Sequence, residues 1–303
     1  MPPSPSPKQT LSFLMRRFRE AGIRPRTQHG QNFLVDYNLQ QLIVRAARLE
    51  PDDVVLEVGT GTGSLAALMA PQVAAVVTVE IDPQLAQLAS EELLGFDNVV
   101  MLRTDALKNK NRLSPTVLDA VRGQIDARGA RRFKLVANLP YNVATPIIAN
   151  LLALDPPPHS MAVTIQKELA DRIAASPGTK DYGALSIWVR SQARVELVRV
   201  LPPSVFWPRP KVSSAILRIV VDPELRARIP DRRFFHEFVR SMFFHRRKLL
   251  RSELVGATKR RLDKPAVDRL MARLGLAPDA RAEQLDVDRM LALSEAVRAE
   301  LGD

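Results

Sequence analysis

The sequence of 303 residues contains no cysteine, which excludes disulfide bonds, zinc sites built on thiolates and cysteine nucleophiles. Its four histidines, His29, His159, His236 and His245, lack the spacing of metal ligands, so no metal cofactor is expected. No apolar run approaches the roughly 20 residues that a membrane-spanning helix needs. We therefore expect an ordinary globular protein, and the absence of cysteine makes the cytoplasm its simplest location.

Positive charge, in contrast, is plentiful. The chain has 44 Lys and Arg against 33 Asp and Glu, which gives a formal net charge of +11. A strong positive field concentrates polyanions and gives salt-sensitive binding through phosphate contacts. Nucleic acid is the favoured partner, and an anionic membrane surface is the weaker alternative.

Short β-branched runs alternate with amphipathic stretches from Asp53 onward, which is the pattern of βα units around a parallel sheet. The last two runs are separated by a proline-rich loop, Leu201–Lys211, which is too short for a crossover helix and predicts an antiparallel hairpin at one edge. A polar, basic segment, Lys108–Arg132, is predicted to be an insertion with one surface helix. The seven predicted strands are 54–58, 76–80, 99–103, 134–137, 161–165, 195–200 and 215–221.

The β-branched runs stop after Asp222, and residues 231–302 have helical apolar spacing with many arginines. The N-terminus is rich in proline and serine and lacks the basic-then-apolar order of a secretory signal, so disorder is expected there. We predict a disordered, basic tail over 1–25, a sheet domain over 26–225 and a helical domain over 226–303.

A glycine-rich turn follows the first predicted strand, and Gly59, Gly61 and Gly63 lead from it into a helix. Glycine lets the backbone approach a ligand that a Cβ atom would push away. A dinucleotide-binding fold is one interpretation of this turn. The G-x-G-x-G spacing and the preceding Glu57 are more usual for a nucleoside that has no pyrophosphate.

Acidic residues end the next two predicted strands. Glu80 stands where a carboxylate can accept both ribose hydroxyls, an arrangement that also fits NAD. Asp105 ends the third strand near the same crevice and suits the exocyclic amine of an adenine. Two carboxylates at consecutive strand ends together predict an adenosyl ligand.

The fourth predicted strand runs into Asn138-Leu139-Pro140-Tyr141. An adenine N6 is a poor nucleophile because its lone pair is delocalised into the ring, and two hydrogen-bond acceptors can turn this nitrogen toward tetrahedral geometry. The Asn138 side-chain oxygen and the carbonyl of Leu139 or Pro140 are the predicted acceptors, and Pro140 stiffens the loop. Tyr141 is predicted to stack on the target base and Phe206 to close its other face, although either ring could belong to the core.

Nine motifs in a fixed order carry a resemblance to a known family. They are Gly30–Asp36, Glu57–Gly63, Val79–Asp82, Asp105-Ala106, Asn138–Asn142, Gln166–Glu168, Tyr182–Ser186, Phe206–Ser214 and Arg246–Arg251. Through them the chain, from about residue 26 to the C-terminal helices, resembles the bacterial ribosomal RNA adenine dimethyltransferases of the KsgA type.

The resemblance implies an α/β fold of the class I S-adenosylmethionine-dependent methyltransferases, with a Rossmann-like seven-stranded sheet and a small C-terminal all-helical domain. It also implies dimethylation of the N6 amines of two adjacent adenosines near the 3′ end of small-subunit (16S) ribosomal RNA, on a pre-ribosomal particle. The implied cofactor-binding residues are Asn32, Leu34, Gly59, Gly61, Glu80, Asp105 and Asn138. The implied RNA-binding residues are Arg209, Lys211, Arg246, Arg247, Lys248 and Arg251.

The chain departs from the family pattern in its C-terminal part. A usual Gln-Arg-Arg-Lys run is His245–Lys248 here, and an Asn expected after Arg251 is replaced in Arg251–Glu253. These differences bear on the RNA contacts and not on the predicted methyl-transfer centre. A solvated helix face is the alternative interpretation of the C-terminal cations.

Other functions remain open at this point. A related group of dimethyltransferases modifies large-subunit RNA, confers macrolide resistance and shares the cofactor motifs. A non-catalytic ribosome-assembly or transcription factor could keep the fold without turnover, and an NAD-dependent dehydrogenase is the remotest alternative. We expect a monomer, because nothing in the sequence indicates an oligomerisation seam.

Overall fold

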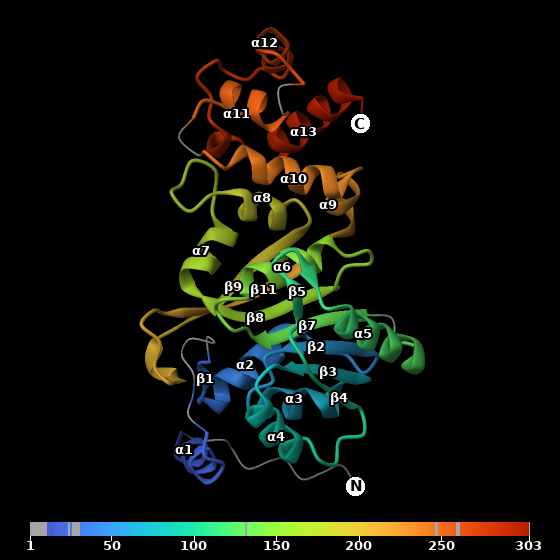
Figure 1. The fold of residues 1–303 in the computed structure, drawn as a ribbon, viewed down its shortest axis with the longest axis vertical. Coiled ribbons are helices and arrows are strands. Elements are labelled where there is room, and N and C mark those ends of the chain that lie inside the picture. The colour runs from blue at the N-terminus through green and yellow to red at the C-terminus, as the bar shows by residue number, and fades with distance from the viewer. Residues whose placement is uncertain are drawn as a thin grey trace. The chain divides into compact units, whose positions relative to one another are not determined.

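The computed structural model describes residues 11–23, 25, 31–130, 132–245, 248–258 and 261–302. The described residues form two compact units (Figure 1). The first unit holds the residues up to Ala170 together with Glu196–Val220, and the second holds Asp171–Val195 and the residues from Val221 onward. The sequence predicted a single cut after residue 225, whereas residues 171–195 cluster with the C-terminal helices. The predicted domains 26–225 and 226–303 stay a prediction, because compact units in the structure do not show which segments fold independently.

A seven-stranded mixed sheet lies at the centre of the first unit, in the order β4-β3-β2-β7-β8-β11-β9. The strands β4, β3, β2, β7 and β8 run parallel, and β11 is antiparallel to β8. All seven predicted strands are confirmed, and the last two are neighbours at one edge of the sheet. The bounds are β2 Asp53–Val58, β3 Ala75–Glu80, β4 Val99–Arg103, β7 Arg132–Asn138, β8 Ser160–Gln166, β9 Ala193–Leu201 and β11 Ser214–Val221.

Every residue of β2 and β3 is buried, as expected for central parallel strands whose apolar side chains are covered on both faces. The covering helices are amphipathic or apolar, and α2 packs on β7 and β8 while α4 packs on β3 and β4. The helices of the first unit after α1 are α2 Tyr37–Ala47, α3 Ser64–Met69, α4 Pro83–Glu92, α5 Pro115–Arg128 and α6 Ala144–Ala153, with the 3-10 turns η2 Ala70–Gln72 and η3 Pro203–Val205.

The segment Lys108–Arg132 is not a surface insertion throughout. Helix α5 within it packs on β2, β3 and β7 through its buried Val117 and Val121, so it is the crossover connection from β4 to β7. The part that projects is a short hairpin formed by β5 (Leu107–Asn109) and β6 (Arg112–Leu113). The polar outer face of α5, with Asp119, Arg122, Asp126 and Arg128, explains why the sequence predicted a surface helix.

The predicted disordered tail over 1–25 is wrong for Leu11–Glu20, which form helix α1. Leu14 and Phe18 on one side of this helix are each only 2% exposed. The prolines and serines that suggested disorder are concentrated in residues 1–10, which lie outside the described residues. Apolar spacing within 11–20 is helical, and this local signal outweighs the composition of the segment as a whole.

The second unit is helical apart from the ends of strands, which confirms the predicted helical C-terminal region. Its core includes Phe235, Val239, Leu254 and Met290, each completely buried. The helices are α7 Lys167–Ala174, which crosses from the first unit, α8 Ala184–Arg190, α9 Pro223–Ala227, α10 Arg232–Met242, α11 Leu250–Ala257, α12 Lys264–Arg273 and α13 Val287–Leu301, with the turn η4 Ala282–Gln284.

Among the described residues, no helix is both long and apolar enough to cross a membrane. Within the same described ranges, no three His, Asp or Glu side chains gather in a way that would hold a metal ion.

Candidate active site

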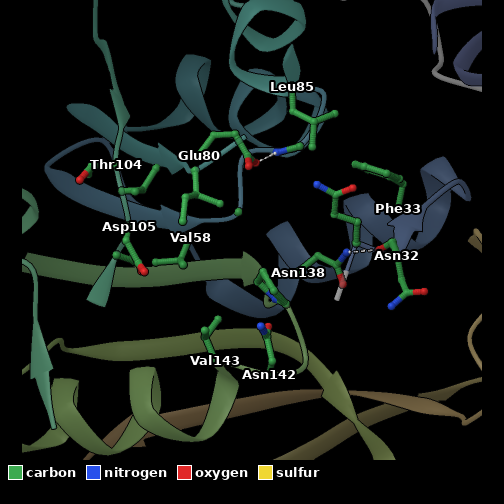
Figure 2. A pocket seen from close by; sticks show the side chains of 17 residues that line it. Asn32, Phe33, Val58, Glu80, Leu85, Thr104, Asp105, Asn138, Asn142 and Val143 are labelled. Carbon is green, nitrogen blue, oxygen red and sulfur yellow. Dashed lines mark hydrogen bonds between the residues drawn. The ribbon is translucent and has the colours of Figure 1, made fainter. Parts of the chain in front are cut away.

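A cavity of about 230 Å³ opens in the first unit where the parallel strands β2, β3, β4 and β7 end (Figure 2). Ligands of open α/β sheets bind at this carboxyl edge, because the loops that follow the strands diverge there. Seven of the predicted site residues line the cavity: Asn32, Gly59, Gly61, Glu80, Asp105, Asn138 and Pro140. The structure thus brings together side chains that are more than 100 residues apart in the sequence.

The glycine-rich turn supplies the floor of the cavity. Gly59 has φ +85° and a Cβ atom placed on it would lie 3.1 Å from Cδ of Pro140. Gly61 has φ +57° and its Cβ would lie 3.2 Å from the ring of Phe33. Both positions therefore favour glycine for two reasons, the left-handed backbone and the close approach of Pro140 or Phe33.

Glu80 ends β3 and fastens this turn. Its Oε2 accepts a hydrogen bond from the Gly61 amide at 2.9 Å, and its Oε1 accepts one from the Asp82 amide at 2.9 Å (Figure 2 draws the first). Burial raises the pKa of Glu80, and the hydrogen bonds from these two amides act against that rise. Each carboxylate oxygen keeps a lone pair that can accept from a ribose hydroxyl.

Asp105 lies across the cavity after β4, next to Thr104. Its Oδ1 accepts the Leu107 amide at 2.8 Å, which fixes the side chain at the start of the β5–β6 hairpin. The carboxylate is exposed, so its other oxygen can accept a hydrogen bond from a ligand.

Asn138 ends β7 and points toward Asn32 (Figure 2). Its Nδ2 donates to the Asn32 carbonyl at 2.9 Å. A carbonyl oxygen can only accept, so the amide nitrogen of Asn138 must face Asn32 and Oδ1 must face the other way. The hydrogen bond therefore fixes the side-chain oxygen of Asn138 as an available acceptor.

Residues Gln31–Leu34, here called the strap, run along one wall of the cavity. Phe33 and Leu34 form β1, which pairs with β10 (Phe206–Trp207) in a small antiparallel ladder. Gln31 Nε2 donates to Asp82 Oδ2 at 3.3 Å, which ties the strap to the start of α4. Gln31, Asn32 and Phe33 line the cavity, while Leu34 is 5% exposed and packs into the core behind it.

Leu139 and Pro140 follow Asn138 in the predicted catalytic loop. Leu139 is buried, and its amide donates to the Thr164 carbonyl at 3.1 Å, which holds the loop against β8. The Pro140 carbonyl accepts the Val143 amide at 3.1 Å and so uses one of its two lone pairs. Either the Leu139 or the Pro140 carbonyl can supply the second predicted acceptor.

The two predicted stacking rings lie outside the cavity wall. Tyr141 is half-buried, its hydroxyl is 2.6 Å from Ser214 Oγ, and burial raises its pKa. Phe206 is 3% exposed and packs in the core cluster with Leu34, Val55 and Val136. The Leu34↔Phe206 pairing of β1 and β10 holds the Phe206 ring in the core, so the predicted stacking of Phe206 on a base is corrected to a packing role.

The predicted RNA-binding residues fall into both units. Arg209 and Lys211 are exposed in the loop before β11 of the first unit, and Lys248 is exposed in the second. Arg251 in α11 forms an ion pair with Asp268 of α12 at 2.5 Å, so the protein itself already supplies this guanidinium with a partner. Arg246 and Arg247 lie outside the described residues.

Sequence reasoning missed Phe33 and Leu85, which line the cavity. The signal for Phe33 was present, since it lies inside the Gly30–Asp36 motif, but an apolar side chain suggested core. Glu57, noted before the glycine turn, has a different role from a ligand. It is completely buried, accepts a hydrogen bond from Thr78 Oγ1 at 2.5 Å, and burial raises its pKa to about 8.

The chain is similar to known proteins of one family. The family model described as "Ribosomal RNA adenine dimethylase" matches residues 22–298. "Ribosomal RNA small subunit methyltransferase A" of Halothermothrix orenii is 37% identical over 270 residues, which is 88% of this chain and 86% of the relative. The protein of the same name from Caldanaerobacter subterraneus is 38% identical over 277 residues, 91% of this chain and 98% of the relative.

Two solved structures share the fold. A dimethyladenosine transferase from Plasmodium falciparum has a TM-score of 0.69 at 24% identity, covering 85% of this chain and 94% of that one. The 23S rRNA methyltransferase ErmE has a TM-score of 0.60 at 24% identity, covering 88% of this chain and 99% of that one. On the family match and the identity to its curated relatives, the chain belongs to the ribosomal RNA adenine dimethylase family, whose members are S-adenosylmethionine-dependent methyltransferases.

Proposed function

We propose that this protein dimethylates the N6 amines of two adjacent adenosines near the 3′ end of small-subunit ribosomal RNA, as a step in ribosome biogenesis. The names of its curated relatives, which are 37% and 38% identical over almost the whole chain, support the small-subunit substrate. The single observation that carries the chemistry is the hydrogen bond from Asn138 Nδ2 to the Asn32 carbonyl, because it fixes an acceptor at the cavity.

The residues that line the cavity fit an adenosyl cofactor. Gly59 and Gly61 let the turn pass close to Pro140 and Phe33, where a Cβ atom would come within 3.1 and 3.2 Å of these side chains. Glu80 offers two oxygens for ribose hydroxyls, and Asp105 has an exposed oxygen for an adenine amine. We propose that these residues, with Asn32 of the strap, hold S-adenosylmethionine, and that Leu34 supports the strap from the core.

When bound, S-adenosylmethionine supplies an electrophilic methyl group on its sulfonium. The chain's own task is to make the target nitrogen nucleophilic. Asn138 Oδ1 accepts one hydrogen of the adenine amine, and the carbonyl of Leu139 or Pro140 accepts the other. With both hydrogens held, the nitrogen lone pair leaves conjugation with the ring and points along one direction. Tyr141, whose hydroxyl lies 2.6 Å from Ser214 Oγ, stacks on the target base.

We also propose that Arg209 and Lys211 of the first unit and Arg246, Arg247, Lys248 and Arg251 of the C-terminal region contact RNA phosphates. The net charge of +11 supports this role. Loss of one phosphate contact reduces the slope of the logarithm of the binding constant against the logarithm of salt concentration by about one. Charge reversal at Lys211 or Lys248 should therefore weaken RNA binding and flatten its salt slope, and an unchanged slope would remove that residue from the phosphate-binding set.

We propose that the protein acts in the cytoplasm, as a monomer, on a pre-ribosomal small subunit. The methylation activity is tested by nucleoside mass spectrometry of under-methylated small subunits, and separately of large-subunit RNA, after incubation with the protein and S-adenosylmethionine. Dimethyladenosine in small-subunit RNA alone is the expected result. Product only in large-subunit RNA would support the macrolide-resistance activity, and no product in either would favour a non-catalytic assembly factor.

A further inference from the structure

The strap has an aromatic layer behind it that the catalytic chemistry does not use. Phe18 of α1, Phe33 of the strap and Trp207 of β10 form what we call the aromatic cluster. The rings of Phe18 and Phe33 meet edge to face with centroids 5.1 Å apart, and those of Phe18 and Trp207 are 5.2 Å apart. Phe33 and Trp207 are cross-strand partners, with centroids 6.5 Å apart. Phe18 thus contacts both halves of the β1–β10 pairing.

The Phe33 ring lies between Phe18 and the cofactor cavity. One part of its ring lies over the glycine turn, where a Cβ atom on Gly61 would come within 3.2 Å of Cε1. Its plane is at 88° to that of Phe18. The same ring therefore forms part of the cavity wall and rests on Phe18 from behind.

Helix α1 is itself anchored to the other wall of the cavity. Phe18 is 2% exposed and packs with Leu85 and Leu88 of α4, and Leu85 also lines the cavity. Arg17 adds an ion pair with Glu91 of α4 at 2.5 Å. Phe18 consequently connects the strap to α4, the two sides between which a bound adenosyl group would lie.

Hydrogen bonds from Asn138 to the Asn32 carbonyl at 2.9 Å and from Gln40 to the Leu34 carbonyl at 2.7 Å hold the backbone of the strap, but neither fixes the Phe33 ring. Strands β1 and β10 are two residues long, and isolated pairs of short strands are marginal in water. The hydrogen bond from Gln31 to Asp82 is long at 3.3 Å and is only partly buried. Packing of Phe18 against Phe33 is therefore a substantial part of what orders the strap before a ligand arrives.

We infer that Phe18 is a positioning residue for cofactor binding, which acts by holding Phe33 and the strap in their binding conformation. This inference rests on the proposed function, since it takes the cavity to be the S-adenosylmethionine site. A wall that is ordered in advance spares the ligand the entropy cost of ordering it. Asn138 stands on β7, but its oxygen is oriented by the Asn32 carbonyl of the strap. At saturating cofactor the bound ligand itself holds the strap in place, so Phe18 affects cofactor affinity and leaves turnover at saturation unchanged.

The test is the dissociation constant of S-adenosylmethionine, measured by titration calorimetry on the full chain. Replacing Phe18 by alanine should raise it about tenfold, the size of effect expected for the loss of edge-to-face aromatic packing. The Phe18→Leu variant keeps α1 packed on α4 and should give an intermediate increase. In steady-state methylation, KM for S-adenosylmethionine should rise in both variants while kcat stays within about twofold.

The matched control is Phe238→Ala, which removes a phenyl ring of similar burial (6% exposed) from α10 of the second unit. It should lower the melting temperature and leave the dissociation constant unchanged. Equal cofactor affinity of Phe18→Leu, Phe18→Ala and the unaltered protein would overturn the inference, as would an equal loss of affinity in Phe238→Ala. Failure of the unaltered protein to bind S-adenosylmethionine would instead overturn the proposed function, and the inference with it.

Discussion

Buried charged groups lie at both ends of the central parallel strands, but their charges are balanced in different ways at the amino ends and at the carboxyl ends. At the amino ends of β2 and β7, Lys134 Nζ lies 2.6 Å from Asp53 Oδ2, and these side chains are 3% and 0% exposed. Lys134 also donates to the Arg48 carbonyl at 2.6 Å, and Arg132 pairs with Glu50 at 2.7 Å. Opposite charges therefore neutralise one another at this edge.

At the carboxyl ends of β2 and β3, the buried carboxyls Glu57 and Glu80 have no cation as a partner within the described part of the chain. Their hydrogen-bond partners are the Thr78 hydroxyl and the amides of Gly61 and Asp82. Burial raises the pKa of both groups. Ion pairs thus stabilise the amino ends of the strands. Carboxyl groups without a cation lie instead at the carboxyl ends, where the ligand is proposed to bind.

Removing one partner from the paired edge should give the largest effect. Lys134→Ala leaves the buried Asp53 carboxylate with only the Arg132 Nε, at 3.9 Å, as a nearby cation, which should cost about 3 kcal/mol of unfolding free energy. Urea denaturation measures this loss, with exposed Lys108→Ala as the control. The dissociation constant of S-adenosylmethionine should not change where the variant is folded. A loss below about 1 kcal/mol would mean that this edge is not held by charge pairing.

Removing an acceptor at the pocket edge should have the opposite profile. Asn138→Ala should lower the methylation rate about 100- to 1000-fold, the cost of deleting one preorganised polar group in a reaction centre. Cofactor affinity should be largely spared, and stability should fall by only about 1 kcal/mol for the lost bond to Asn32. The control is Asn98→Ala, which breaks bonds to the carbonyls of Ala70 in η2 and of Val73, the residue that follows it. Equal activity of the Asn138 variant and the unaltered protein would refute the catalytic assignment.

The buried carboxyl of Glu57 should give stability a slope with pH. Its ordinary pKa of 4.5 is raised to about 8 by burial, so the native state keeps a proton that the unfolded chain loses. The contribution of this protonated carboxyl to the free energy of unfolding is complete below pH 4.5. It decreases as pH rises toward about 8, by up to about 1.4 kcal/mol per pH unit. Glu57→Gln should reduce the slope in denaturation at pH 5 to 8, while exposed Glu224→Gln should not. Parallel slopes for both variants would contradict the assignment.

His159 at the paired edge should give a smaller slope of opposite sign. Its pKa is lowered from 6.5, first by burial and then by Lys134 and Arg132. The unfolded chain therefore takes up a proton below pH 6.5 that the native state resists, and stability falls as pH falls through this range. Since the side chain is partly exposed, the effect should be about 0.5 kcal/mol or less. His159→Gln should remove it in the same denaturation series; a steeper acid loss in the variant would contradict the cause.

Much of this fold could be predicted because buried parallel strands are continuous β-branched runs, as in Val54–Val58 and Ala75–Glu80. Glu80 and Asp105 could be predicted as cofactor ligands because they lie at or just after the ends of β3 and β4, whereas Asn32, Leu34 and Asn138 were implied only by the family resemblance. The strands β1 and β10 could not be found, because two residues carry no periodicity.

Two assignments failed for a different reason. A ring such as Phe206 gives the same sequence signal whether it stacks on a base or packs in the core, and only its pairing with Leu34 decides between them. Helix α5 buries only Val117 and Val121, so its polar composition concealed its place as a crossover helix. In both cases the missing information was which surface the segment meets.

The β5–β6 hairpin has a practical consequence for spectroscopy. Lys110 lies exposed near its tip, and the chain contains no cysteine. A Lys110→Cys substitution would therefore create the sole thiol of the protein, open to a fluorophore or spin label without any background reaction. Because Asp105 is fastened to the first residue of this hairpin, a label there would sit on the same short segment as a predicted cofactor ligand and could report the arrival of the cofactor as a change in signal.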